Sequence, residues 1–144
     1  SFTNRRLDEP QKHVSRLAAL QAYEIAGLGP EDMHVAEVHD ASAMGEIIQA
    51  ENLGLARPGE AGPAAERGEF TLGGRMPINT SGGLESKGHP LGATGIGQLY
   101  ELVTQLRGDA GARQVEGARH AIQENGGGLQ GIEEAAVAVH ILSR

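Results

Sequence analysis

The stretch that decides the fold is Asn79-Thr80-Ser81-Gly82-Gly83-Leu84-Glu85-Ser86-Lys87-Gly88-His89-Pro90-Leu91-Gly92-Ala93-Thr94-Gly95-Ile96-Gly97. Its density of glycine excludes an ordinary strand or helix and lets the backbone come close to a ligand or to another backbone. A segment with helical spacing follows His89, and a helix N-terminus offers unpaired N–H groups and a partial positive charge. His89 is therefore a candidate general base or oxyanion donor, the alternative being a loop histidine that only caps backbone groups.

The composition of the whole chain excludes several classes of protein. Its 144 residues, 39% of them hydrophobic, suffice for one domain with one core. A net charge of -7 without a long basic run argues against nucleic acid as a partner. No apolar run is long enough for a membrane span and no signal peptide is visible, so we expect a cytoplasmic protein. The absence of cysteine excludes zinc–thiolate sites.

Hydrophobic spacing predicts alternating helices and strands. We expect helices over 14–25, 43–53 and 96–107, strands over 35–38, 76–79, 119–124 and 135–142, a long irregular loop over 54–77 and a turn over 125–128. The third helix should pack through the apolar side chains Ile96, Leu99, Val103 and Leu106. This order predicts an α/β fold in a single domain, residues 1-144, with a mixed sheet and a C-terminal β-hairpin.

Polar or Gly-rich segments fall at the expected ends of several strands and at the start of one helix. These segments are His39-Asp40, His89 and Asn125 to Gly128. Ligands of α/β sheets lie at the carboxyl ends of strands, so we expect these segments to converge. The Gly126 segment either supplies an oxyanion-hole amide or forms only a hairpin turn. His39, Asp40 and His89 lack the spacing of metal ligands, so we expect no metal site.

These residues resemble the C-terminal half of thiolases, most closely the sterol-carrier-protein-2 type. Val38-His39-Asp40-Ala41-Ser42 resembles the His-Asp-Cys-Phe motif of that branch. Asn79 to Gly83, followed by Lys87 to Gly95, resembles the Gly-His-Pro signature with its flanks. Glu124-Asn125-Gly126-Gly127-Gly128 stands where other thiolases have Cys-x-Gly-Gly-Gly. The similarity runs from about residue 14 to the end, with the N-terminal thiolase half absent.

The resemblance implies a fold and residue roles. The fold is a thiolase-type half, a mixed five-stranded sheet (four-stranded in this chain) with helices on both faces. His89 would activate a nucleophilic cysteine, His39 would position a water or donate to the oxyanion, and the Gly126 amide would line the oxyanion hole. The implied substrate is a coenzyme A thioester, with no tightly bound cofactor. The implied substrate-binding residues are Asn79, Gly82, Gly83 and Asn125.

Two departures from the thiolase pattern concern the cysteines. The nucleophilic cysteine of thiolases lies in their N-terminal half. The two positions that carry the second, acid/base cysteine in different branches hold Glu124 and Ala41 here. Glu124, Asp40 or His39 are candidates to replace that group.

Three functions remain open. The first is the C-terminal half of a thiolase-like acyl-CoA acyltransferase, catalysing Claisen condensation or thiolysis with a thiolase N-terminal half or subunit as partner. The second is a thiolase-like retro-aldolase or condensing subunit that works with an OB-fold (DUF35) protein in steroid or aromatic acyl-CoA degradation. The third is a non-catalytic module that binds lipid, acyl chains or a partner. We expect a homo- or hetero-oligomer, and no thiolase turnover by the isolated chain.

Overall fold

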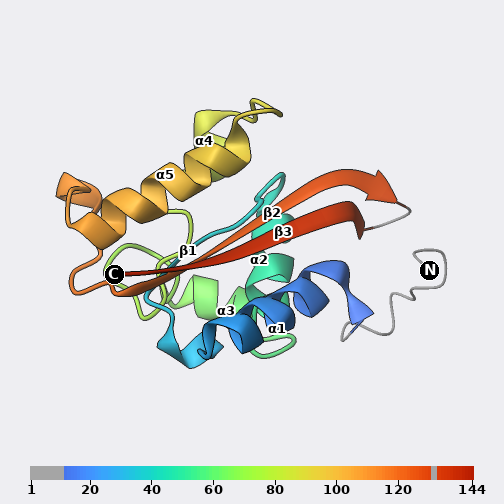
Figure 1. Ribbon diagram of the computed structural model, residues 1–144, viewed down its shortest axis with the longest axis horizontal. Helices are drawn as coiled ribbons and strands as arrows, with labels where there is room; N and C mark the ends of the chain where they lie inside the picture. Colours follow the sequence, from blue (N-terminus) through green and yellow to red (C-terminus); the bar gives the residue numbers. More distant parts are fainter. Residues whose placement is uncertain (1–11, 131–132) are drawn as a thin grey trace.

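The computed structural model describes residues 12–130 and 133–144. Helices precede and separate the first strands, and the last two strands are consecutive (Figure 1). The three predicted helices and the predicted strands over 35–38, 119–124 and 135–142 are found in the predicted order. The predicted strand over 76–79 is reduced to a bridge at Ile78, and two short helices were not predicted. In chain order the elements are α1 (Val14–Ala26), the 3₁₀ helix η3 (Pro30–Asp32), β1 (Val35–Glu37), α2 (Ala43–Asn52), α3 (Ala61–Glu66), α4 (Gly83–Lys87), α5 (Thr94–Arg107), the 3₁₀ helix η4 (Gly111–Arg113), β2 (His120–Gln130) and β3 (Glu133–Ser143).

One mixed sheet of order β1-β2-β3 runs through the domain. Strand β1 is parallel to β2, with Val35 opposite Ala121, and β2 is antiparallel to β3. A parallel bridge from Ala36 to Ile78 sets the segment before the Gly-rich stretch beside β1. The predicted α/β fold with a C-terminal hairpin is confirmed. The described residues form three strands and this bridge, where the resemblance implied four or five strands.

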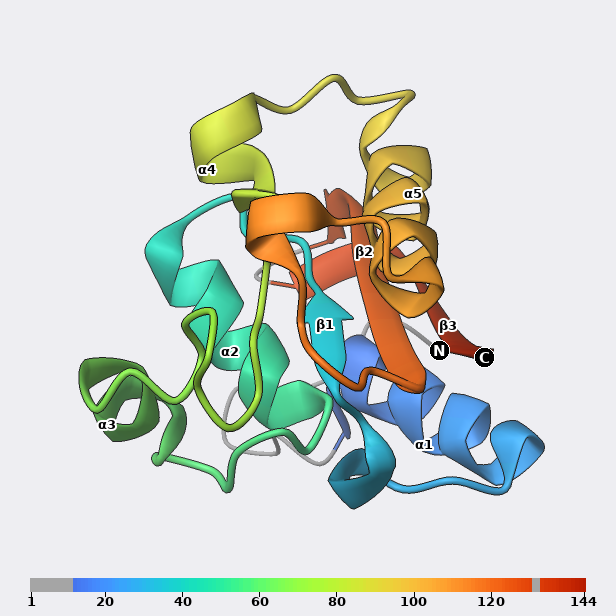
Figure 2. The same ribbon diagram turned by 90° about the vertical axis from the view of Figure 1, so that its left-hand side faces the viewer.

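Helices cover both faces of the sheet, as Figures 1 and 2 show. Helix α5 packs on β1 and β2 from one side, and α1 packs on β3 from the other, where α2 and α3 also lie. Successive residues of β1 supply the two cores: Val35 packs with Leu102 under α5, and Ala36 packs on the α1 side. The short strand is buried on both faces for this reason.

The buried face of α5 differs from the prediction. Ile96 was expected to pack inward, but it is 69% exposed, and Leu106 alone of the four predicted residues is buried. The other buried positions are Thr94, Gln98, Glu101, Leu102 and Gln105. The Gln98 amide donates to the Glu124 carbonyl at 3.0 Å, so polar groups on this face exchange water for internal partners. Ile96 and Tyr100 of α5 are exposed.

The predicted turn at Asn125 to Gly128 is wrong. These residues belong to β2, which continues to Gln130, and Gly126 lies opposite Val137 in the ladder. A Cβ atom at Gly126 would lie 2.4 Å from Glu134 Cγ. Glycine at this position therefore lets a side chain of β3 cross the strand.

The segment over 54–77, predicted to be an irregular loop, contains the short helix α3 and two anchors in the core. Phe70 is 4% exposed and Met76 is 2% exposed. The Ile78 N–H donates to the Phe70 carbonyl at 2.9 Å, which fixes the segment that enters the Gly-rich stretch. No helix in the described part of the chain is both long and apolar enough to cross a membrane.

Candidate active site

Three segments that are distant in the sequence meet at the carboxyl end of β1. His39 follows β1, His89 precedes α5, and Asn125 lies within β2. The ring centroids of His39 and His89 are 4.8 Å apart, and the rings are nearly perpendicular, at 88°. The Asn125 amide nitrogen lies 3.1 Å from His39 Nδ1. The structure thus brings three of the predicted site residues together.

The contact with Asn125 determines which nitrogen of His39 carries the proton. The Asn125 Nδ2 group only donates, so His39 Nδ1 accepts and the proton of the neutral ring lies on Nε2. Burial, and next the nearby His89, lower the pKa of His39. The ring is therefore neutral at neutral pH and carries an N–H donor at Nε2.

The contacts of His89 assign the opposite tautomer. The Thr94 hydroxyl donates to the Pro90 carbonyl at 3.2 Å, so its oxygen accepts the proton of His89 Nδ1 at 2.8 Å. His89 Nε2 then has a free lone pair, as a general base requires. Thr94 was not predicted as a site residue. Its position at the start of the helix, five residues after His89, was the available signal.

Asn125 depends on a glycine of α5 for its place beside His39. A Cβ atom at Gly95 would lie 3.2 Å from Asn125 Oδ1, tighter than ordinary van der Waals contact. The small first turns of α5 therefore let the amide of Asn125 fit between the helix and the sheet. The side chain predicted to bind substrate also orients His39.

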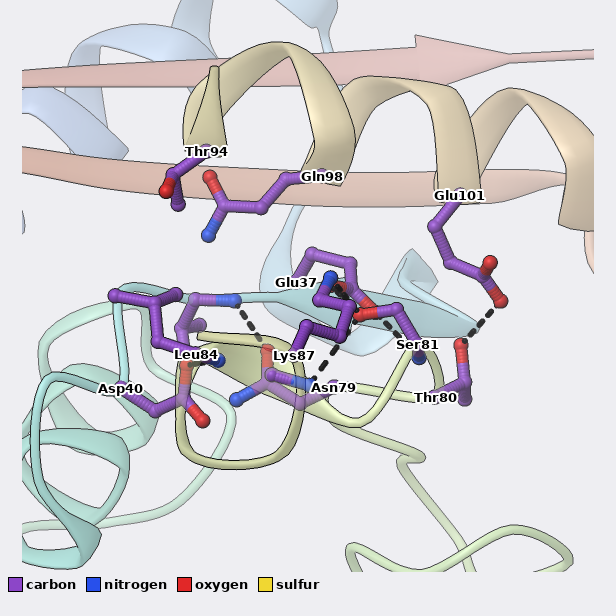
Figure 3. Close-up of polar contacts among 12 residues, drawn as sticks. Glu37, Asp40, Asn79, Thr80, Ser81, Leu84, Lys87, Thr94, Gln98 and Glu101 are labelled. Carbon is purple, nitrogen blue, oxygen red and sulfur yellow. Dashed lines mark hydrogen bonds and ion pairs between the residues drawn. The ribbon is translucent and has the colours of Figure 1, made fainter. Parts of the chain in front are cut away.

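Asp40 and Gly83 act together at the start of α4. Asp40 is 4% exposed, and its Oδ1 accepts from the Leu84 N–H at 2.7 Å (Figure 3). A Cβ atom at Gly83, where φ is +60°, would lie 1.9 Å from Asp40 Oδ2. The carboxylate predicted as an acid/base group thus caps a helix, and Gly83 makes room for it.

Asn79, predicted to bind substrate, uses both ends of its side chain within the protein. Its Oδ1 accepts from the Val38 N–H at 2.9 Å, and its Nδ2 donates to Glu46 at 2.8 Å. Gly82 is the N-cap of α4 with φ of 97°, a conformation that favours glycine. Both residues shape the turn that leads to His89.

Glu124 lies on the sheet face opposite Asn125, because successive side chains of a strand alternate. It is fully buried, and its Oε2 accepts from the His39 N–H at 3.0 Å. Burial, followed by the charge of Glu134, raises the pKa of Glu124 to about 8. The structure places this candidate acid/base group under the backbone of His39, away from the His89 ring.

A polar network that was not predicted ties the Gly-rich stretch to β1 (Figure 3). Fully buried Glu37 accepts from the Ser81 hydroxyl at 2.6 Å, and Lys87 donates to the same hydroxyl. Burial raises the pKa of Glu37, and the contacts with Ser81 and Lys87 oppose this rise. Lys87 is two residues before His89, so the network fixes the start of the loop that carries His89. A glutamate within the apolar run of β1 was the available signal.

No group of three or more His, Cys, Asp or Glu side chains in the described ranges has a geometry that suits a metal ion. Gly126 lies within β2, one residue after Asn125. The role of its amide in an oxyanion hole stays a prediction. The arrangement holds two adjacent imidazoles beside the hydrogen-bond donor Asn125.

A comparison with known protein families identifies the family of this chain. The model of one family, thiolase C-terminal domain-like, matches residues 4–144. The chain belongs to this family. The predicted relationship to thiolases is confirmed.

Two curated relatives and one solved structure resemble this thiolase C-terminal domain. Sterol carrier protein 2 of Rattus norvegicus is 53% identical over 112 residues, 78% of this chain and 20% of that protein. Acetyl-CoA acetyltransferase of Methanothermobacter thermautotrophicus is 49% identical over 127 residues, 88% of this chain and 32% of that protein. The Ltp2-ChsH2(DUF35) aldolase matches with a TM-score of 0.76 at 27% identity, over 90% of this chain and 31% of that one. The chain thus spans about a fifth to a third of the length of these relatives.

Proposed function

We propose that this chain supplies the base and the oxyanion donor of a thiolase-like acyl-CoA acyltransferase. The observation that carries the proposal is the opposite protonation of two adjacent imidazoles, an N–H at His39 Nε2 and a lone pair at His89 Nε2. The two ring centroids lie 4.8 Å apart, so both nitrogens can serve one reacting group. The proposed substrate is a coenzyme A thioester.

In the proposed step, His89 Nε2 takes the proton of a cysteine thiol that a thiolase N-terminal half supplies. The thiolate attacks the thioester carbonyl, a sulfur–carbon bond forms, and the negative charge moves to the carbonyl oxygen. His39 Nε2–H donates to that oxygen. The carbonyl then re-forms, the coenzyme A sulfur leaves with the proton from His89, and the acyl group stays on the cysteine.

The exposed face of α5 supports a partner that covers it. Ile96 and Tyr100 lie one turn apart on this face, 69% and 72% exposed, and Leu91 just before the helix is 84% exposed. Contiguous exposed apolar surface is typical of contacts between proteins. The exposed face of α5 adjoins the loop of His89, which is where a half that brings the cysteine must approach.

A chimera tests the proposal. This chain replaces the matching 127-residue segment of the archaeal acetyl-CoA acetyltransferase, and release of coenzyme A from acetyl-CoA is measured. His89→Ala should lower the rate of acylation roughly 100-fold or more, the usual size of a general-base effect. His120→Ala is the matched control, because His120 contacts Ser143 at the far end of β2. Equal acylation in the His89→Ala chimera, or thiolysis of acetoacetyl-CoA by the isolated chain, contradicts the proposal.

A second function, retro-aldol cleavage of an acyl-CoA with an OB-fold (DUF35) partner, is supported by the site and by one neighbour. Ala41 has no acid/base group, and Glu124 is fully buried on the other face of β2. The similarity to an aldolase with a DUF35 component agrees with this alternative. In the chimera, Ala41→Cys should raise thiolysis if the chain is an acyltransferase that lacks only this group. An unchanged rate, together with co-purification of an OB-fold protein, favours the aldolase, and an inactive chimera that binds acyl-CoA favours a binding module.

A further inference from the structure

Two consecutive residues of β2 hold His39 from opposite sides of the sheet. Asn125 contacts the ring at Nδ1, 3.1 Å away, and Glu124 Oε2 accepts from the main-chain N–H at 3.0 Å. The Glu124 carbonyl in turn accepts from Gln98 of α5, which fixes this part of the strand. The position of the histidine ring thus depends on a carboxyl group that lies outside the reacting space.

Other groups face the Glu124 carboxyl from every element that packs against it. Helix α1 presents the Ser15 hydroxyl, and β3 presents Glu134, whose Oε2 lies 3.6 Å from His13 Nε2. Gln49 of α2 donates to the other oxygen of Glu134 at 2.6 Å. Glu124 Oε1, Ser15 Oγ and Glu134 Oε2 are buried without a hydrogen-bond partner in the described part of the chain. Ser15 lies near enough to lower the pKa of Glu124, although the two groups are not in hydrogen-bond geometry.

This shortage of donors favours a carboxyl group that keeps its proton. A buried carboxylate is stable only when donors compensate its charge, and among the described residues the His39 N–H is the one donor in hydrogen-bond geometry with it. The pKa of about 8 agrees with this environment. In the neutral acid, Oε2 is the carbonyl oxygen that accepts from His39, and the proton lies on Oε1, facing Ser15 and Glu134.

We propose that Glu124 is a positioning residue, a neutral carboxylic acid that anchors the backbone of His39 so that Asn125 can fix the tautomer of the ring. This proposal rests on the proposed function, because the positioning of His39 affects catalysis only if His39 is the oxyanion donor. The hydrogen bond between Glu124 and the His39 N–H does not depend on that function. The alternative role as an acid/base group at the substrate requires a carboxyl that reaches the His89 side of the sheet, and Glu124 is 0% exposed on the opposite side.

The test uses nitrogen NMR of the histidine rings in the 144-residue chain, which needs no turnover. In the wild type, His39 should show a non-protonated Nδ1 and a protonated Nε2. Glu124→Gln keeps the accepting oxygen without a charge and should preserve these signals. Glu124→Ala should move both nitrogen signals of His39 toward the average of the two tautomers. Glu69→Ala is the control, because this glutamate pairs with Arg67 and Arg75 outside the site, and it should leave the His39 signals unchanged.

A pH titration covers the case in which Glu124→Ala does not fold. The His39 signals of the wild type should show an inflection near pH 8, the pKa of Glu124, which the Glu124→Gln variant lacks. Identical titration curves in the two proteins overturn the proposal, as do wild-type His39 signals in Glu124→Ala or equal disruption by both substitutions. If these NMR results hold while the chimera is inactive, the proposed function fails and the positioning role stands.

Discussion

Two acidic side chains near His39 lie against glycine residues, and they differ in their hydrogen-bond donors. Asp40 fills the space beside Gly83 and accepts from two N–H groups of α4, with Leu84 at 2.7 Å. Glu134 crosses Gly126, and its Oε2 has no hydrogen-bond partner in the part of the chain described. Glycine thus makes room for a carboxylate that accepts from the N–H groups of a helix start and for a carboxylate on a strand whose contacts are the side chains of Gln49 and His13.

The difference follows from the secondary structure that surrounds each acid. The first N–H groups of a helix have no partner within the helix, so they can stabilise a negative charge. The N–H groups of a central strand are used in its ladders and are not available. Asp40 can therefore cap α4. Glu124 and Glu134 share a pocket that favours protonation of Glu124.

The largest expected effect comes from Gly83→Ala, which removes the space for Asp40. The new Cβ would lie 1.9 Å from Asp40 Oδ2, and Gly83 has φ of +60°, so both the contact and the backbone are strained. We expect a loss of roughly 3 kcal/mol in the free energy of unfolding, measured by urea denaturation. Gly83→Ala combined with Asp40→Ala should be less destabilised than the sum of the single variants. A Gly83→Ala chain as stable as the wild type contradicts the assigned role of this glycine.

The pH dependence of stability tests the buried carboxyl group of Glu124, which lies near Glu134. The pKa of Glu124 rises from an ordinary unfolded value of about 4.3 to about 8, so the folded chain binds more protons between these pH values. The free energy of unfolding therefore falls as the pH rises from about 4 to 8. Glu124→Gln cannot ionise, and its stability relative to the wild type should increase by about 2 kcal/mol from pH 6 to pH 8. Glu116→Gln, at an exposed site, is the control. Parallel curves for wild type and Glu124→Gln contradict the prediction.

Gly126→Ala should have a smaller effect, because the side chain that it meets can move. The added Cβ would lie 2.4 Å from Glu134 Cγ, while φ at Gly126 is not positive. We expect a loss of about 1–2 kcal/mol in thermal or urea unfolding, the usual range for an overpacked site. Glu134→Ala in the same chain should restore most of it. No rescue in the double variant means that the strand itself, rather than Glu134, requires glycine.

The sequence predicts the order of elements well, because long apolar patterns mark them. The continuous apolar run of β3 and the helical spacing of apolar residues in α1 and α2 were sufficient to predict these elements. The pattern fails where polar residues are buried. Gln98 and Gln105 of α5 have partners on β2 and near η4, and no local spacing reveals those partners. Ile96 was placed inward for the same reason and is exposed.

The candidate site was predictable only through its most specific residues. His39 and His89 stand in motifs that resemble those of thiolases, and both lie at the carboxyl end of β1. Their tautomers were not predictable, because they depend on Thr94 and on Asn125, which comes from another element. Gly126 was assigned to a turn, because glycine marks both turns and close approaches and the sequence does not distinguish them.

The smallest expected effects come from two glycines on the first turns of α5. Nothing lies within 4 Å of a Cβ atom at Gly97, so Gly97→Ala should stabilise the isolated chain by about 0.5–1 kcal/mol, the difference in helix propensity. At Gly95 the same gain is opposed by Asn125 Oδ1 at 3.2 Å, so the net change in stability should be close to zero. The pair separates packing from site geometry: only Gly95→Ala should shift the nitrogen NMR signals of His39, because only Gly95 contacts the amide that holds the ring. Equal His39 signals in both variants mean that the space at Gly95 does not position Asn125.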